Sequence, residues 1–307
     1  MSKHEDFAVA ERQLFMRYQL PIDSRFIQLA DPQLRLRLLC CGDGPPALFV
    51  HGGGALAAEW TPLLATLRGI RMFAIDRPGC GLSDGFDYRH VDLRQHAVAV
   101  LSATLDALGL ASAPIVGCSM GGLWALWLAL DHPERVAALA LLGSPALFLT
   151  TRIPFGMRLL AIPGLNRLVM ALERPSHRQY LRFMSRVGER QALAGMPAEQ
   201  EAMFLAAERL PTYRQGWLSL LECALQLGGS GIKPAWHLGA DELRRVRQPT
   251  TFVWGGRDPF GGPEVGRAAC AIMPAATLAE LPHAGHLPWF DDPERCAVAV
   301  RDIVTAA

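Results

Sequence analysis

The segment Gly117-Cys118-Ser119-Met120-Gly121 places a serine between two glycines, where an apolar run meets an amphipathic one. This strand, turn and helix context is that of a G-x-S-x-G nucleophile elbow, in which a sharp turn exposes the serine hydroxyl. Glycines suit such a turn because they add no bulk beside the serine and let the helix pack close to the sheet. The bare pentapeptide recurs by chance, so the interpretation depends on its surroundings.

A serine hydroxyl becomes a good nucleophile only with a base and with a carboxylate that orients this base. We assign the base to His286, in the loop after the last predicted strand, and the carboxylate to Asp258, just past the preceding strand. Both positions fall at the carboxyl ends of strands that we expect to be parallel, the edge where open α/β sheets place ligands. The chain order Ser119, Asp258, His286 is one of the orders known for this chemistry.

Other residues compete for these roles. His283 lies three residues before His286, and Asp241 or Glu242 could orient the base in place of Asp258. The glycine that precedes His286 favours this histidine, and we expect His283 to pack within the loop.

The loop after the third predicted strand reads His51-Gly52-Gly53-Gly54. Its glycines have no side chains that would cover their backbone N–H groups, and we expect these groups near the serine. We expect the N–H groups of Gly53 and Met120 to form an oxyanion hole, with Gly54 as the alternative to Gly53. Losing one such donor typically costs about 3 kcal/mol of transition-state stabilisation. The ring of His51 is expected to hold this loop by hydrogen bonds.

A rival motif overlaps this loop, because Gly52, Gly54 and Ala57 satisfy G-x-G-x-x-A and Asp76 ends the next strand. This pattern is the dinucleotide-binding fingerprint. However, it follows two earlier strands instead of opening the sheet, and it gives the serine, aspartate and histidine no purpose. We therefore expect Asp76 and Arg77 to brace the loop and predict no cofactor.

The composition indicates a large buried core and few charged partners. Half of the 307 residues are hydrophobic, and 30 basic against 29 acidic side chains leave a net charge of +1. Nucleic acid and charged membrane surfaces are therefore unfavourable partners, and a small-molecule substrate is expected. The sequence contains no convincing cluster of zinc ligands and leaves a homo-oligomer open.

The seven cysteines include no C-x-x-C pair, which favours free thiols in a reducing compartment. The first twenty residues have no apolar core typical of a secretion signal, and no apolar stretch is long enough to span a bilayer. We expect a soluble cytoplasmic protein.

Short apolar runs alternate with helix-like segments along most of the chain. Predicted strands cover 25–29, 34–40, 47–50, 71–75, 113–116, 136–142, 250–254 and 277–281. Predicted helices cover 57–67, 91–108, 120–130, 263–273 and 293–304. This alternation predicts an α/β fold with a mostly parallel sheet covered on both faces, and the first two strands form an antiparallel hairpin at its edge.

The alternation stops near residue 144 and resumes at 250. The intervening sequence has helical periodicity without a convincing strand, which predicts an inserted helical cap. We divide the chain into an N-terminal arm (1–24), a core (25–145 and 244–307) and the cap (146–243).

Together these landmarks resemble the α/β-hydrolase fold superfamily of serine hydrolases with a helical cap. The resemblance covers about residues 25–304 and rests on the His51-Gly52 loop followed by Trp60, the segment 76–83, the elbow with Gly122, the segment 255–258, and Gly285-His286. It implies an eight-stranded, mostly parallel sheet flanked by helices, and a triad of Ser119, Asp258 and His286.

Within this superfamily the triple glycine and the elbow resemble hydrolases that cleave carbon–carbon bonds in ring-fission products of aromatic compounds. Those enzymes commonly carry Asn before the nucleophile and Trp after the histidine, where this chain has Cys118 and Leu287. The form Gly285-His286-Leu287-Pro288 is closer to esterases, lactonases and cofactor-free haloperoxidase-like enzymes. We expect Cys118 to be a buried filler.

We therefore expect hydrolysis of a carboxylic ester or lactone of a small apolar or aromatic substrate through an acyl-enzyme. The alternatives are carbon–carbon hydrolysis of vinylogous diketones, acyl transfer, and a noncatalytic or single-turnover ligand receptor on the same fold. Three cap arginines, Arg152, Arg158 and Arg182, are candidates for binding a substrate carboxylate. Apolar cap residues that could meet the substrate or pack the cap itself are Phe155, Met157, Leu160, Phe183, Met184, Phe204 and Trp217.

Overall fold

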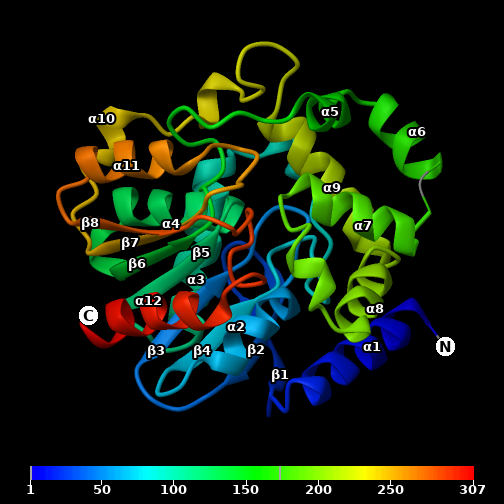
Figure 1. The fold of residues 1–307 in the computed structure, drawn as a ribbon, viewed down its shortest axis with the longest axis horizontal. Coiled ribbons are helices and arrows are strands. Elements are labelled where there is room, and N and C mark those ends of the chain that lie inside the picture. The colour runs from blue at the N-terminus through cyan, green and yellow to red at the C-terminus, as the bar shows by residue number, and fades with distance from the viewer. Residues whose placement is uncertain (1, 173) are drawn as a thin grey trace.

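The computed structural model describes residues 2–172 and 174–307. Its centre is a sheet of eight strands in the order β1-β2-β4-β3-β5-β6-β7-β8 (Figure 1). The strands are β1 (Asp23–Leu29), β2 (Leu34–Cys41), β3 (Pro46–Val50), β4 (Arg71–Ile75), β5 (Ala113–Cys118), β6 (Val136–Leu142), β7 (Thr250–Gly255) and β8 (Ala276–Leu281). β2 runs antiparallel to β1 and β4, whereas the other neighbouring pairs are parallel. The predicted sheet and its edge hairpin are confirmed.

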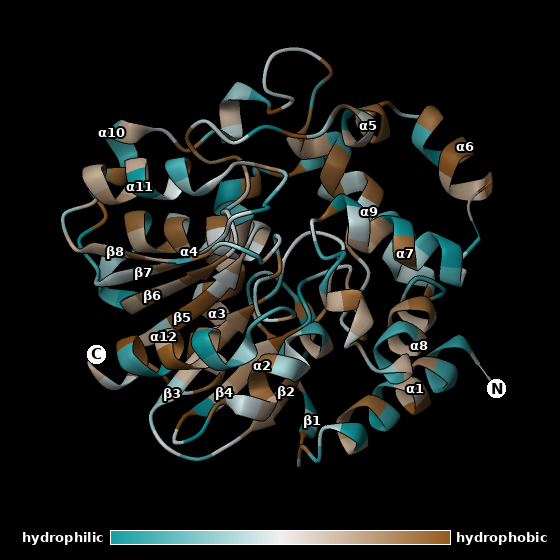
Figure 2. Ribbon diagram, in the orientation of Figure 1, coloured by the Kyte–Doolittle hydropathy of each residue, from teal (hydrophilic) through white to brown (hydrophobic). Residues whose placement is uncertain are grey.

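Helices cover both faces of this sheet. They are α2 (Thr61–Thr66) and α12 (Pro293–Thr305) on one face, and α3 (Leu93–Ala107), α4 (Met120–Asp131) and α11 (Pro263–Ile272) on the other. Strand β5 is buried along its whole length, as expected for a strand covered on both faces. Figure 2 shows hydrophobic residues along β5 and a mixture of hydrophobic and hydrophilic residues on the surrounding helices.

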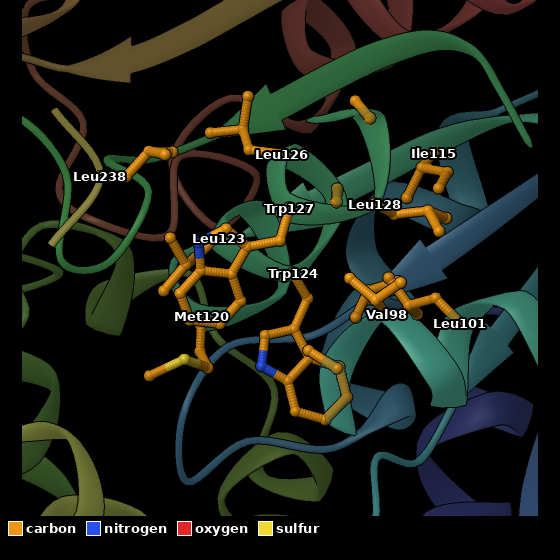
Figure 3. Close-up of a cluster of buried hydrophobic side chains, with 14 of the residues drawn as sticks. Val98, Leu101, Ile115, Met120, Leu123, Trp124, Leu126, Trp127, Leu128 and Leu238 are labelled. Carbon is orange, nitrogen blue, oxygen red and sulfur yellow. The ribbon is translucent and has the colours of Figure 1, made fainter. Parts of the chain in front are cut away.

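Helix α4 is enclosed on all sides. Every residue from Met120 to Leu130 is buried. In Figure 3 its side chains lie among Val98 and Leu101 of α3 and Ile115 of β5. This packing fixes the helix that begins directly after Ser119.

The predicted cap region is helical. Between β6 and β7 the chain forms α5 (Phe155–Arg158), α6 (Leu165–Leu172), α7 (His177–Arg186), α8 (Ala198–Ala207), α9 (Pro211–Ala224) and α10 (Ala240–Leu243). Within its described residues the β contacts are two isolated bridges, Phe148 with Leu238 and Leu225 with Ile232. Figure 1 shows α5 to α9 gathered at one side of the sheet. The domain boundaries stay a prediction.

The predicted N-terminal arm contains a helix, α1 (Lys3–Arg17), which packs against α8 (Figure 1). It buries Phe7 and Leu14, and the carboxylate of Glu11 forms an ion pair of 2.5 Å with the guanidinium of Arg37. The arm is thus tied to the sheet through β2. In the described part of the chain no single helix is long and apolar enough to cross a membrane; the bent pair 155–161 and 165–172 reaches the required length and composition only when combined.

Candidate active site

Ser119 occupies the turn between β5 and α4. Its backbone dihedral angles, φ 49° and ψ −113°, lie outside the regions that serine ordinarily adopts. Such strain is typical of a nucleophile elbow, and tight packing maintains it here. A Cβ atom at Gly121 would lie 1.9 Å from the carbonyl oxygen of Val50, so only glycine allows this approach of helix to strand.

Asp258 and His286 form a buried pair. Nδ1 of His286 donates a hydrogen bond of 2.8 Å to Oδ2 of Asp258, and the two residues are only 5% and 6% exposed. Burial alone would raise the pKa of Asp258, but the charge and hydrogen bond of His286 lower it below its ordinary value. With Nδ1–H engaged by a carboxylate, Nε2 is the nitrogen left to accept a proton.

Two residues missed at the sequence level hold this carboxylate. The amide of Ser144 donates to Oδ2 of Asp258 at 3.0 Å, and the amide of Phe260 donates to Oδ1 at 2.9 Å. The hydroxyl of Ser144 also lies 3.4 Å from Nδ1 of His286, and the ring of Phe260 packs against the imidazole. A signal for Ser144 existed, because Gly143-Ser144-Pro145 follows β6 at the carboxyl edge of the sheet.

The glycine loop is held by Arg77 and His51. Arg77 donates to the carbonyl oxygens of His51 and Gly52 at 3.1 and 2.6 Å, and its own amide donates to Nε2 of His51 at 2.9 Å. Nδ1 of His51 therefore carries the proton and donates to the carbonyl of Gly52 at 2.8 Å. Burial, followed by the charge of Arg77, lowers the pKa of His51 well below its ordinary value, so the ring stays neutral.

This arrangement orients the amide of Gly53. In a trans peptide the carbonyl of Gly52 and the N–H of Gly53 point in opposite directions. Because Arg77 and His51 both bind that carbonyl, the N–H of Gly53 points away from them. Gly53 lines the cavity that also holds Ser119, whereas Gly54 does not.

One cavity brings the candidate residues together. Ser119, His286, Gly53 and Met120 all line it. Most of the remaining wall is apolar, including Ala55, Leu147, Ile153, Met157, Phe183, Val187, Trp217, Leu220, Leu221, Phe260 and Leu287. Among the lining residues the ionisable side chains are those of Glu59 and His286. None of the described residues that line this cavity is a lysine or an arginine.

The competing acids and base lie elsewhere. The side chain of Asp241 is 99% exposed and pairs with Arg244. Glu242 forms an ion pair with Arg94, and His283 is exposed. None of the three lines the cavity.

The candidate arginines of the cap do not reach the cavity. Arg158 donates to the carbonyls of Ile153 and Gly229, while Arg152 and Arg182 are exposed. Of the apolar cap residues singled out from the sequence, Met157, Phe183 and Trp217 line the cavity. Phe155 is 66% exposed, and Leu160 packs on the main core. Met184 and Phe204 belong to a separate cluster inside the cap.

Asp76 and Cys118 have structural surroundings. Asp76 is fully buried, and its carboxylate accepts hydrogen bonds from the amides of Ala57 and Leu82 and from Arg37. Its oxygens are therefore engaged inside the protein, which argues against a ribose contact. Burial raises the pKa of Cys118 well above its ordinary value, as expected for an inert thiol.

A further pair of carboxyl groups holds the loop of His286. The amide of Leu287 donates to Oε1 of Glu189 at 2.5 Å, and the amide of Gly285 donates to Asp291 at 3.0 Å. Burial and then the neighbouring carboxylate of Asp291 raise the pKa of Glu189 to about 10. The amide of His286 itself donates to Val187 at 2.9 Å. The segment between α7 and α8 thus accepts hydrogen bonds from the loop that carries the candidate base.

Residues 45–293 match the alpha/beta hydrolase fold family. This range includes the elbow, Asp258 and His286. The chain belongs to this family. It is 28% identical over 281 residues to 2-hydroxy-6-oxo-6-phenylhexa-2,4-dienoate hydrolase of Burkholderia cepacia, which covers 86% of this chain and 90% of the relative. It is 27% identical to pimeloyl-[acyl-carrier protein] methyl ester esterase of Aromatoleum aromaticum, over 85% of this chain and 98% of the relative.

The fold is also that of a solved esterase. The crystal structure of naproxen esterase from Bacillus subtilis superimposes with a TM-score of 0.72, 19% sequence identity, and coverage of 98% of both chains. The chain is therefore a hydrolase of this family, whose relatives include both carbon–carbon hydrolases and esterases. Within residues 2–172 and 174–307 no group of three or more His, Cys, Asp or Glu could hold a metal ion.

Proposed function

We propose that this protein is a serine hydrolase that cleaves a carboxylic ester of a small apolar or aromatic substrate through an acyl-enzyme. The observation that carries the proposal is the 2.8 Å pair of Asp258 and His286 on the cavity that also holds Ser119 in its strained turn. An uncharged ester is favoured over a substrate that carries a carboxylate, because the described residues of the cavity wall are mostly apolar and include no cationic side chain.

In this mechanism the hydroxyl of Ser119 attacks the ester carbonyl while Nε2 of His286 takes its proton. Asp258 keeps the imidazole in the required tautomer and stabilises the imidazolium. The amides of Gly53 and Met120 bind the oxyanion. His286 then protonates the leaving alcohol, and a water deprotonated by His286 releases the acid.

Carbon–carbon hydrolysis is the second candidate because the Burkholderia cepacia relative acts on a dienoate, which carries a carboxylate. A buried carboxylate requires a cation or several donors. The absence of lysine and arginine from the described cavity wall therefore favours the neutral ester.

The two reactions are separated by comparing kcat/KM for p-nitrophenyl esters of increasing acyl length with that for 2-hydroxy-6-oxo-6-phenylhexa-2,4-dienoate. We expect repeated turnover of the esters and little or no cleavage of the dienoate. A higher kcat/KM for the dienoate would move carbon–carbon hydrolysis to first place. One slow turnover with retained ligand would favour a receptor, and capture of the acyl group by added alcohol would indicate acyl transfer.

A further inference from the structure

Glu59 is an acidic residue on the wall of the cavity that holds Ser119 and His286. It lies in a short 3₁₀ helix, Ala57–Trp60, directly after the glycine loop, and is only 5% exposed. Its backbone carbonyl accepts a hydrogen bond from the indole of Trp289. Its carboxyl group has no hydrogen-bond or ion-pair partner among the described residues. The mechanism proposed above does not use it.

The groups around Glu59 provide no counter-charge. Cys80, Cys118, Tyr180 and Tyr213 lie within electrostatic range of Glu59, and burial is the largest cause that raises their pKa values. These thiols and phenols are therefore neutral near pH 7. Burial alone raises the pKa of Glu59 to about 8, so this carboxyl group is mostly protonated at that pH.

The other ionisable residue of the wall is already engaged. Nδ1 of His286 donates to Asp258, so the imidazole is held by a different carboxylate. Glu59 thus presents a free hydrogen-bond donor and acceptor within a mostly apolar cavity. A buried polar group without a partner is unfavourable, and a substrate group that satisfies it would be selected strongly.

We propose that Glu59 is a specificity residue whose neutral carboxyl group donates a hydrogen bond to a second, uncharged carbonyl group of the substrate, remote from the scissile ester. This inference rests on the proposed ester hydrolysis. The preferred substrates are small apolar esters that also carry a ketone, an amide or another ester. A purely hydrocarbon ester would enter the cavity and leave Glu59 unpaired.

Position-scanned keto esters test this inference. In one series a ketone replaces each distal methylene of a pentanoate ester in turn, and in a second series it replaces each distal methylene in the alcohol of butyl acetate. We expect the wild-type protein to hydrolyse at least one keto ester with a kcat/KM about tenfold or more above that of its hydrocarbon parent.

Two variants separate recognition from structure. Glu59→Leu replaces the carboxyl group by an apolar side chain of similar size, and we expect the keto ester to lose its advantage over its hydrocarbon parent. The kcat/KM of the parent itself should rise or stay level, because no unpaired carboxyl group is left in the cavity. Glu59→Gln keeps a donor and should keep the preference. The ratio of the two kcat/KM values should fall above about pH 8 in the wild type and stay constant in Glu59→Gln, because only the carboxyl group loses its donor.

Several results would overturn the inference. These are equal rates on keto and hydrocarbon esters in the wild type, a keto preference that survives in Glu59→Leu, and a stronger preference for an amino ester, which would require an ionised Glu59. Failure to hydrolyse any ester, the hydrocarbon parents included, would instead contradict the proposed function on which this inference rests.

Discussion

The backbone amide of Leu287 donates a 2.5 Å hydrogen bond to the carboxyl group of Glu189, across 98 residues of sequence. Leu287 directly follows His286, and Glu189 lies in the region between α7 and α8, inside the predicted cap. Val187 accepts the amide of His286 nearby. The position of the candidate base therefore depends on the inserted helices as well as on the sheet.

Replacing Glu189 by alanine should lower kcat by at least about tenfold with little change in KM. The buried amide of Leu287 would lose its acceptor, which costs about 1–3 kcal/mol and releases the loop of His286. Glu189→Gln should be close to the wild type, because the pKa of about 10 makes the native side chain a neutral acceptor at pH 7. Steady-state kinetics at pH 7 compares the kcat of the two variants. An equal loss of kcat in Glu189→Ala and Glu189→Gln would contradict this positioning role.

Asp258→Asn should reduce kcat about 10⁴-fold while the protein remains folded, because an amide no longer fixes the tautomer of His286. The matched control is Asp241→Asn, which changes the competing and fully exposed acid. We expect the control to retain wild-type kcat. Inactivation of the Asp241 variant with a mild effect at Asp258 would reverse the assignment.

Gly143→Ala should displace the loop of His286. The backbone of Gly143 has a φ of +73°, and a Cβ atom there would lie 2.1 Å from the carbonyl oxygen of His286. Gly109 has a similar φ of +69° with open space around it, so Gly109→Ala reports the strain alone. The midpoint temperature of thermal unfolding and kcat should both fall further in Gly143→Ala than in Gly109→Ala. Equal losses in the two variants would contradict a steric clash with the carbonyl of His286.

The stability of the wild type relative to Glu59→Gln should decrease as the pH rises from about 4.5 to 8. The folded state keeps the proton of Glu59 up to a pKa of about 8, whereas the unfolded chain releases it near the ordinary value of 4.5. The advantage of the protonated wild-type residue is thus complete below pH 4.5 and lost as the pH approaches 8. Urea unfolding at several pH values measures this difference, and Glu134→Gln, at an exposed glutamate, serves as the control.

Periodicity and motif order predicted most of the fold. Every predicted strand is present within two residues of its expected ends, because strands buried on both faces and amphipathic helices leave clear local patterns. The places of Ser119, Asp258 and His286 after strands predict them as the candidate triad. Helix α1 was not predicted within the N-terminal arm. Its packing on α8 and its ion pair with Arg37 depend on partners distant in sequence.

Residues that act through long-range contacts were missed. Glu189 is one glutamate among many in a polar helical region, and no local pattern marks its contact with Leu287. Glu59 left a clearer signal, since it is a lone charge in the apolar run between Ala55 and Trp60. Such a charge indicates a polar role inside the protein, but the cavity that defines this role exists only in the folded chain.

Labelling with a fluorophosphonate, read by mass spectrometry of the modified peptide, tests directly whether Ser119 is an activated nucleophile. We expect stoichiometric labelling at Ser119, loss of labelling in folded Ser119→Ala, and strongly slowed labelling in Asp258→Asn and in a His286→Ala variant. Well-folded protein that stays unlabelled under conditions where small probes enter the cavity, or that is labelled at another residue, would contradict an activated nucleophile at Ser119.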